Sequence, residues 1–238
     1  MLTLSQYHVK TDDVKRIPQI IVMRKHKISA SILAADFLNL EKEVKNVIEA
    51  GADLIHIDVM DGKFVPNITM GVDVVKAINS RFDIPIEVHL MIKQPEDHVE
   101  IFAKAGADTI IFHFESTTHH DRLIGRIHNL GKKAGISLIP STNESVLKYL
   151  YNILDQILVM TVNPGFCGQK FISTQLDKVA NIKKMLESLN LENKIDISVD
   201  GGINKSTAAK SLEKGADIIV VGSTIFSSKN YKKTISEL

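Results

Sequence analysis

Histidines and aspartates occupy alternate positions in short apolar runs that are typical of β-strands. His56 and Asp58 lie in the run LIHIDVM, and His89 lies in the run IEVHLM. Because side chains two residues apart point to the same side of a strand, His56, Asp58 and Met60 should share one side, with the intervening apolar residues on the other. The same alternation places Met91 beside His89. We therefore expect the polar side of each strand to form a candidate site.

A third run, ISVDGG, projects Asp200 at its end. The predicted metal ligands are His56, Asp58, His89 and Asp200, a set of nitrogen and oxygen donors that suits Zn²⁺, or else Fe²⁺, Mn²⁺ or Co²⁺. Each histidine alone could be an ordinary hydrogen-bonded residue at a strand end. Four such side chains at matching strand ends favour a metal site, and the lack of cysteine among them favours an open catalytic site over a closed structural one.

Such a site indicates proton transfer next to a carbonyl group. A divalent cation bound to a carbonyl and an adjacent hydroxyl stabilises the enediolate that forms when the carbon between them loses its proton. If carboxylates stand on both faces of that planar intermediate, one removes the proton and the other returns one from the opposite side. Asp58 and Asp200 are the candidate acid and base, and the expected result is inversion at carbon.

Three glycine-rich turns follow later strands, in the segments NPGFCGQ, DGG and VGST. Glycine lets backbone N–H groups approach an anion, and turns after the last strands of barrel enzymes often hold a phosphate. One such turn is weak evidence, since turns need glycine anyway, but three of them predict a phosphate site. The residues predicted to contact it are Gly165, Phe166, Cys167, Gly168, Gly201, Gly202, Gly222 and Ser223.

The elements that must position these residues follow from an internal repeat. A Gly-Ala-Asp string ends a helical pattern and leads into an apolar run at glycines 51, 106 and 215, so that successive copies lie 55 and 109 residues apart. Each copy is typical of an amphipathic helix, a glycine closing it in the left-handed conformation, and a buried strand. A missing fourth copy should fall near residue 161, where residues 156–162 are strand-like.

Further strand-like runs between these copies bring the total to eight, each followed by a helical pattern. They predict an α/β fold, a single-domain (β/α)8 TIM barrel over residues 27–238. A doubly wound open sheet is the alternative, but the turn after the first run lacks its glycine-rich fingerprint, and the even period favours a closed barrel. Residues 1–26 are expected to be a separate leader, and Met23 is an alternative start of translation.

Composition limits the classes of partner. Lys and Arg number 29 against 28 Asp and Glu, which argues against nucleic acid or an anionic membrane as the main partner. No apolar stretch is long enough to span a membrane, so we expect a soluble protein. The single cysteine, Cys167, cannot form a disulfide within the chain and favours a reducing, cytoplasmic location.

These motifs resemble the D-ribulose-5-phosphate 3-epimerase family. The resemblance rests on SASILAADF, HIDVMDGKFVPNITMG, EVHLMI, VNPGFCGQKF, VDGGI and VGSTIF, and covers Ile28 to about Phe226. It implies a barrel of the ribulose-phosphate-binding type and an isomerase of the pentose phosphate pathway. That enzyme would interconvert D-ribulose 5-phosphate and D-xylulose 5-phosphate by two-base, metal-dependent proton transfer at C3.

The resemblance also assigns residues. It implies that Asp58 and Asp200 are the acid/base pair, that all four ligands hold one divalent cation, and that Ser31 and His89 contact the substrate. Three methionines would cap the reacting ketose, namely Met60, Met91 and Met160, although gap-filling core packing is their ordinary role. Family members are expected to form homo-oligomers, as dimers or hexamers.

Two departures and two alternatives stay open. Cys167 stands where the family usually has glycine, and a positive φ there would strain a cysteine; Ala30 replaces a common proline.

A 3-epimerase of a six-carbon ketose phosphate would keep all of these residues. A non-catalytic sugar-phosphate-binding barrel would keep the turns but lose the carboxylates, whereas this chain has both. A decarboxylase or aldolase is less favoured, because no strand of the metal set ends in lysine.

Overall fold

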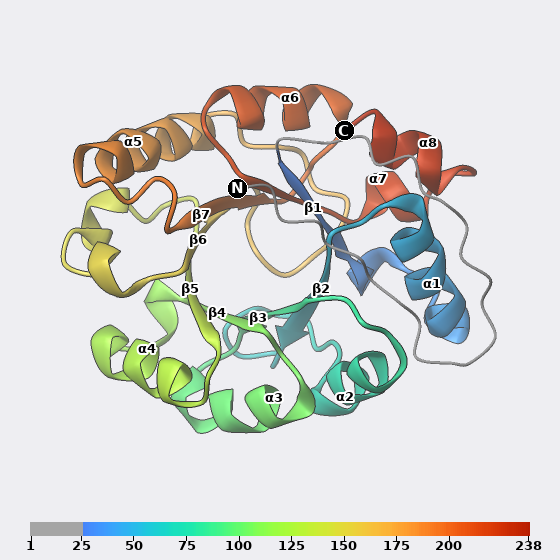
Figure 1. Cartoon of the computed structure of the whole chain (residues 1–238), viewed down its shortest axis with the longest axis horizontal. Helices are drawn as coiled ribbons and strands as arrows, with labels where there is room; N and C mark the ends of the chain where they lie inside the picture. The colour runs from blue at the N-terminus through green and yellow to red at the C-terminus, as the bar shows by residue number, and fades with distance from the viewer. Residues whose placement is uncertain (1–25) are drawn as a thin grey trace.

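The computed structural model describes residues 26–238, and eight parallel strands form a closed ring at its centre (Figure 1). Each strand pairs with the next, and β8 pairs with β1. The strands are β1 (Lys27–Ser31), β2 (Leu54–Met60), β3 (Ile86–Met91), β4 (Thr109–His113), β5 (Lys133–Leu138), β6 (Gln156–Met160), β7 (Asp196–Asp200) and β8 (Ile218–Val221). The ring confirms the predicted TIM barrel and excludes the doubly wound sheet. Apart from His26, the predicted leader lies outside the described residues.

Helices surround the ring on its outside (Figure 1). They are α1 (Leu40–Ala50), α2 (Val72–Arg81), α3 (Val99–Ala105), α4 (His120–Asn129), α5 (Gln175–Ser188), α6 (Lys205–Glu213), α7 (Ser223–Phe226) and α8 (Tyr231–Ser236). The residue types explain individual boundaries. Asn204 starts α6 because its side chain accepts hydrogen bonds from the Ser206 and Thr207 N–H groups, in a capping box.

The alternation along the strands sorts side chains as the sequence predicts. Ile55, Ile57 and Val59 of β2 belong to the large core between strands and helices. Met60, on the other side of the strand, packs instead with Met91 in a small separate cluster. Because the apolar side of each strand faces the helices, the polar side faces the barrel interior, where the candidate site lies.

The repeated glycines adopt the predicted left-handed conformation. Gly51, Gly106 and Gly215 have φ values of 102°, 113° and 102°, each just after a helix. At Gly106 a Cβ atom would lie 2.2 Å from the side chain of Asn79, so this glycine is also required for close packing of α3 on α2.

The aspartate of each repeat binds the strand before its own. In every case one Asp oxygen accepts a hydrogen bond from the backbone N–H at the start of the preceding strand. The pairs are Asp53 with Ile28, Asp108 with Ile86, Asp155 with Ala134 and Asp217 with Ile197, at 2.8 to 2.9 Å. Asp155 is thus the missing fourth copy, recognisable by its hydrogen bond although it has no glycine before it.

The fifth βα unit departs from the prediction of a helix after every strand. Between β5 and β6 the chain forms only short 3-10 helices, Glu144–Leu147 and Tyr151–Ile153. Lys178 of α5 is buried there, and its ammonium group donates to the carbonyls of Ile139 and Pro140. A side chain of α5 therefore satisfies two backbone carbonyls just after β5.

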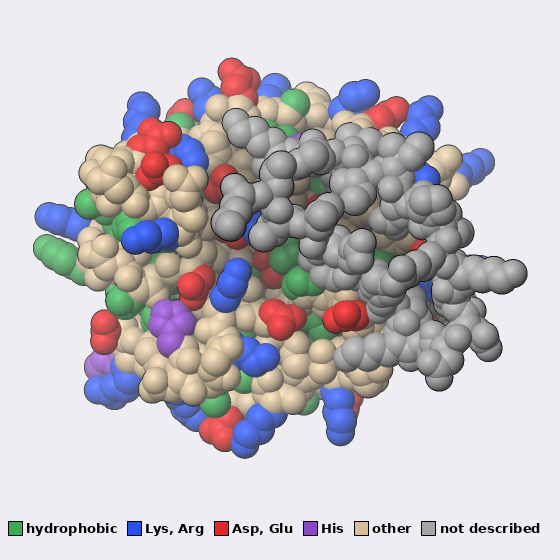
Figure 2. Space-filling view, viewed as in Figure 1, with side chains coloured by type: hydrophobic (Ala, Val, Ile, Leu, Met, Phe, Trp, Pro, Cys, Tyr) green, Lys and Arg blue, Asp and Glu red, His purple; other side chains and the backbone are tan. Residues whose placement is uncertain are grey.

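The surface carries charges of both signs. Figure 2 shows acidic and basic side chains interspersed over the described part of the visible face, without a continuous patch of one sign. Among residues 26–238, none of the helices has both the length and the apolar character of a transmembrane span.

Candidate active site

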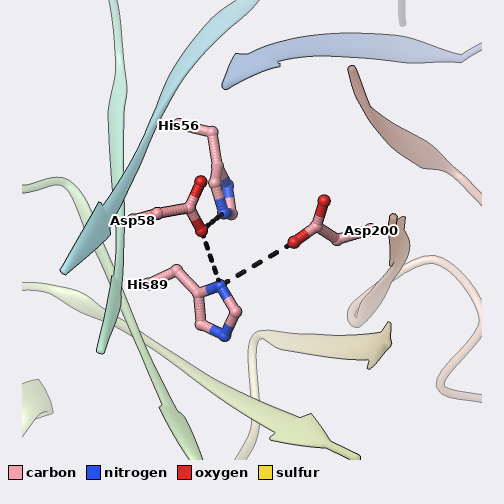
Figure 3. A group of neighbouring side chains, drawn as sticks. All are labelled: His56, Asp58, His89 and Asp200. Carbon is pink, nitrogen blue, oxygen red and sulfur yellow. Dashed lines mark hydrogen bonds and ion pairs between the residues drawn. The ribbon is translucent and has the colours of Figure 1, made fainter. Parts of the chain in front are cut away.

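Four side chains from three strands converge at one end of the barrel. His56 and Asp58 come from β2, His89 from β3 and Asp200 from β7 (Figure 3). One ligand atom of each lies within 4.8 Å of the others. The imidazoles are completely buried, Asp58 is 3% exposed, and Asp200 is the most accessible of the four. The structure therefore brings together the whole set of predicted ligands, and we call it the His/Asp cluster.

Asp58 is at the centre of the hydrogen bonding in the His/Asp cluster. Its Oδ1 lies 3.1 Å from Nδ1 of His89 and 3.4 Å from Nε2 of His56, and its Oδ2 accepts a hydrogen bond of 2.7 Å from the Ser31 hydroxyl. Asp200 reaches in from the opposite wall, with Oδ2 at 3.9 Å from Nδ1 of His89. Both carboxylates thus approach the same small volume from different strands.

The surroundings drive the pKa values of the two carboxylates apart. Burial alone would raise the pKa of Asp58, but the neighbouring imidazoles of His56 and His89 hold it well below its usual range. Burial, together with the negative charge of Asp58, raises the pKa of Asp200 to about 7. Two carboxyl groups with separated pKa values can be in opposite protonation states, as acid/base chemistry requires.

The pKa values of the two histidines also diverge. Burial alone would lower the pKa of His56, but the charge of Asp58 raises it well above its usual range. Burial lowers the pKa of His89 to about 4, a result to which the nearby His113 also contributes. At neutral pH the imidazole of His89 is therefore neutral, the form in which it can donate a lone pair to a cation.

Two further polar residues contact the imidazoles from behind. The carboxylate of Glu87 lies 3.2 Å from Nδ1 of His56, and Nε2 of His113 lies 2.9 Å from Nε2 of His89. Neither Glu87 nor His113 is among the site residues predicted from the sequence. The signal was present, because Glu87 stands two residues before His89 in IEVHLM and so shares its side of the strand.

A pocket opens above the His/Asp cluster and is lined by two of its members, Asp58 and Asp200, and by all of the other predicted site residues. These are Ser31, Asp58, Met60, Met91, Met160, Gly165, Phe166, Cys167, Gly168, Asp200, Gly201, Gly202, Gly222 and Ser223. His56 and His89 are completely buried and are not among the residues that line it. Residues that the sequence did not single out also line it, namely Leu33, Val162, Pro164, Gln169, Ile203 and Val220.

Comparison with known proteins decides the family. Residues 27–226 match the Ribulose-phosphate 3 epimerase family. The chain belongs to this family. The ribulose-phosphate 3-epimerase of Bacillus subtilis (strain 168) is 47% identical over 212 residues, which cover 89% of this chain and 97% of the relative. A chloroplastic ribulose-5-phosphate-3-epimerase from Arabidopsis thaliana is 46% identical over 210 residues, covering 87% and 74%. The predicted family and enzyme class, an isomerase, are confirmed.

Solved structures of lower identity show the same fold. The crystal structure of KGPDC from Streptococcus mutans superposes with a TM-score of 0.69 at 15% identity, over 90% of this chain and 95% of that one. The 3-hexulose-6-phosphate synthase from Salmonella typhimurium gives a TM-score of 0.63 at 19% identity, over 89% and 95%. At such identities the likeness supports the barrel and nothing more specific.

The turn that carries the unusual cysteine of this epimerase family member is unstrained at that position. Gly165 and Gly168 have positive φ values of 124° and 73°, whereas Cys167 is not among the positive-φ residues. The strain that glycine would relieve there is therefore absent. Burial, with the charges of Asp58 and Asp200, raises the pKa of Cys167 to about 11, so that its side chain is a thiol at neutral pH.

The turn after β7 needs both of its glycines. Gly201 and Gly202 have φ values of 115° and 66°. A Cβ at Gly201 would lie 2.3 Å from Val162, and one at Gly202 would lie 2.8 Å from the backbone nitrogen of Phe171. The backbone of this turn thus packs directly against the segment that follows β6, which brings two of the predicted phosphate turns together.

Proposed function

We propose that the chain interconverts D-ribulose 5-phosphate and D-xylulose 5-phosphate by proton transfer at C3. Asp58 and Asp200 carry the proposal, because they reach one pocket from strands that lie three places apart around a closed ring. One carboxylate removes the C3 proton and the other delivers a proton to the opposite face. Membership of the epimerase family supports the same reaction.

The His/Asp cluster fits a divalent cation. It presents two nitrogen and two oxygen donors, and the buried Nε2 of His56 has no hydrogen-bond partner within the described chain. An unsatisfied buried nitrogen is costly unless it has another role, and a cation would accept its lone pair. When bound, the cation would draw charge from the substrate's carbonyl and neighbouring hydroxyl and so stabilise the enediolate. Zn²⁺ is our first choice; Fe²⁺, Mn²⁺ and Co²⁺ suit the same donors.

Neighbouring side chains hold Asp58, one member of the proposed acid/base pair, in position. The Ser31 hydroxyl donates to Oδ2 of Asp58 and fixes the orientation of that carboxylate. His89 contacts Asp58 on its other oxygen, which leaves Asp200 as the more accessible carboxylate. We propose Ser31 and His89 as substrate contacts too, because both lie next to Asp58, the carboxylate to which each is joined.

The phosphate of the substrate would be bound by backbone groups. The turns at residues 165–168, 201–202 and 222–223 line one pocket, and no lysine or arginine is among the pocket residues of the described chain. Backbone N–H groups of glycine turns bind phosphate without a formal positive charge. We therefore propose that these three turns hold the phosphate while the His/Asp cluster holds the ketose end.

The three methionines form an apolar part of the pocket lining. Met60, Met91 and Met160 line the pocket and are at most 4% exposed. Met60 and Met91 pack together in one cluster, and Met160 belongs to the interior cluster beside it. We propose that they exclude water from the enediolate, since flexible thioethers adapt to the shape of a bound ketose.

Incorporation of deuterium at C3 of D-ribulose 5-phosphate in D₂O tests the proposal. With metal supplied, the parent chain should exchange the C3 proton and form D-xylulose 5-phosphate, and Asp58→Asn and Asp200→Asn should each lose most of this activity. Asp73→Asn, at the exposed start of α2, is the control for general effects of removing a carboxylate. Absence of exchange in the parent would refute the epimerase assignment, and full exchange in both site variants would refute the two-base assignment.

Two finer expectations accompany this proposal. The substrate has five carbons, and a six-carbon ketose phosphate that reacts faster in the same assay would overturn that choice. A homo-oligomer, dimer or hexamer, stays a prediction, which light scattering of the purified chain tests.

A further inference from the structure

A layer of buried polar side chains lies beneath the His/Asp cluster, inside the barrel. Its members are Ser29, Glu87, Gln156 and Ser198, and every one of them is at most 3% exposed. Glu87, on β3, is completely buried. An isolated carboxylate in such a place would be expensive, so its hydrogen bonds must account for it.

The partners of Glu87 define its role as an acceptor. Oε2 accepts a hydrogen bond of 2.6 Å from the Ser29 hydroxyl, and Oε1 accepts one of 2.7 Å from the Gln156 amide. Gln156 also donates to the hydroxyl of Ser198, at 3.0 Å. An ionised carboxylate has no hydrogen to donate and can only accept, so its third neighbour, His56, must donate to it as well.

This requirement fixes the tautomer of His56 in the neutral form, the form in which an imidazole binds a cation. Nδ1 of His56 lies 3.2 Å from Oε2 of Glu87, and Nε2 lies on the opposite side of the ring, 3.4 Å from Oδ1 of Asp58. A neutral imidazole carries one proton, on one nitrogen only. If Nδ1 carries it and donates to Glu87, the lone pair resides on Nε2, the nitrogen that faces the cluster and has no hydrogen-bond partner in the described chain.

We propose that Glu87 is a positioning residue that holds His56 in the Nδ1–H tautomer and aims its Nε2 lone pair at the cation. The inference rests on the metal site of the proposed function. Carboxylates placed behind metal-binding histidines fix both the orientation of the ring and the nitrogen that binds. Glu87 therefore acts through His56 and touches neither the pocket nor the substrate.

The tautomer is tested first, in the parent chain, where no substitution can disturb folding. Nitrogen-15 NMR of the zinc-loaded protein should show a proton on Nδ1 of His56 and none on Nε2. A His56 whose Nδ1 carries no proton would overturn the proposal. Metal analysis of the same sample separates this failure from that of the proposed function, because a chain that takes up no zinc refutes the metal site itself.

Metal affinity is the second test, with Co²⁺ as a spectroscopic probe in competition with a chelator. Glu87→Gln keeps the shape of the side chain but removes its charge, and we expect Co²⁺ affinity to fall roughly 10- to 100-fold, with a changed absorption spectrum. Ser198→Ala is the matched control, because Ser198 lies in the same layer and bonds to Gln156 rather than to Glu87. Parent-like affinity and spectrum in Glu87→Gln would overturn the proposal. A loss of affinity in Glu87→Gln alone would support it.

Discussion

The hydroxyl of Ser31 donates a 2.7 Å hydrogen bond to Oδ2 of Asp58, across the pairing of β1 with β2. Both side chains are buried, at 5% and 3% exposure. The hydrogen bond ties one proposed acid/base residue to a neighbouring strand, so the position of the carboxylate does not depend on β2 alone.

We expect Ser31→Ala to slow epimerisation while leaving the fold intact. A hydrogen bond to a charged group contributes about 1.5 to 3 kcal/mol, which corresponds to a loss of roughly ten- to a hundredfold in kcat/KM. Steady-state kinetics measure the effect. Ser137→Ala is the control, because Ser137 is also buried but its hydroxyl has no hydrogen-bond partner in the described chain. Equal rates in the two variants would refute this role for Ser31.

Metal affinity should rise with pH. The pKa of Asp200 is about 7, so below that pH its carboxyl group holds a proton that must leave before an oxygen can bind a cation. The raised pKa of His56 acts in the same direction. Titrations with Co²⁺ at about pH 6 and about pH 8 should therefore show tighter binding at the higher pH. Asp200→Asn, which has no such proton to lose, should flatten the dependence; the same slope in that variant would contradict this explanation.

Metal removal should lower the melting temperature. A cation that binds only the folded chain, at a thousandfold excess over its Kd, stabilises it by about 4 kcal/mol. For a barrel of this size that corresponds to roughly 8 to 16 °C in Tm, measurable by calorimetry with and without a chelator. The shift should shrink in Asp200→Asn, since one ligand is missing. A Tm unaffected by the chelator would show that the His/Asp cluster holds no cation.

Gly202→Ala should destabilise the chain more than Gly168→Ala. Both glycines have positive φ, 66° and 73°, so both substitutions strain the backbone by about 1 to 2 kcal/mol. Only the new Cβ at Gly202 also meets backbone atoms, at 2.8 Å from nitrogen of Phe171, whereas nothing lies within 4 Å at Gly168. Chemical denaturation compares the two, and equal losses would mean that the close approach of these segments is unimportant.

The alternation of residue types predicted most of the site, because it determines which side chains leave a strand on the same side. It placed Asp58 with His56 and separated Met60 from Ile57, as the structure shows. It could not show how far along the barrel axis a residue from another strand lies. Glu87 was missed for that reason, since its partners Ser29 and Gln156 come from strands whose register no single run reveals.

In the fifth βα unit the sequence pattern predicted a helix that the structure does not have. The sequence between β5 and β6 has apolar residues at helical spacing, yet the chain there forms short 3-10 helices. Lys178, distant in the sequence, donates to the carbonyl of Ile139 just after β5, and this contact depends on the packing of α5. Local patterns do not contain such information.

The aspartates that close the repeats divide the barrel into four quarters of two strands each. Asp53, Asp108, Asp155 and Asp217 each bind the other strand of their own quarter, at the end of the barrel opposite the pocket. A circularly permuted chain opened between two quarters would keep every such pair on one continuous segment, whereas an opening inside a quarter would separate one pair. The loops around the pocket can thus change in evolution without disturbing these hydrogen bonds.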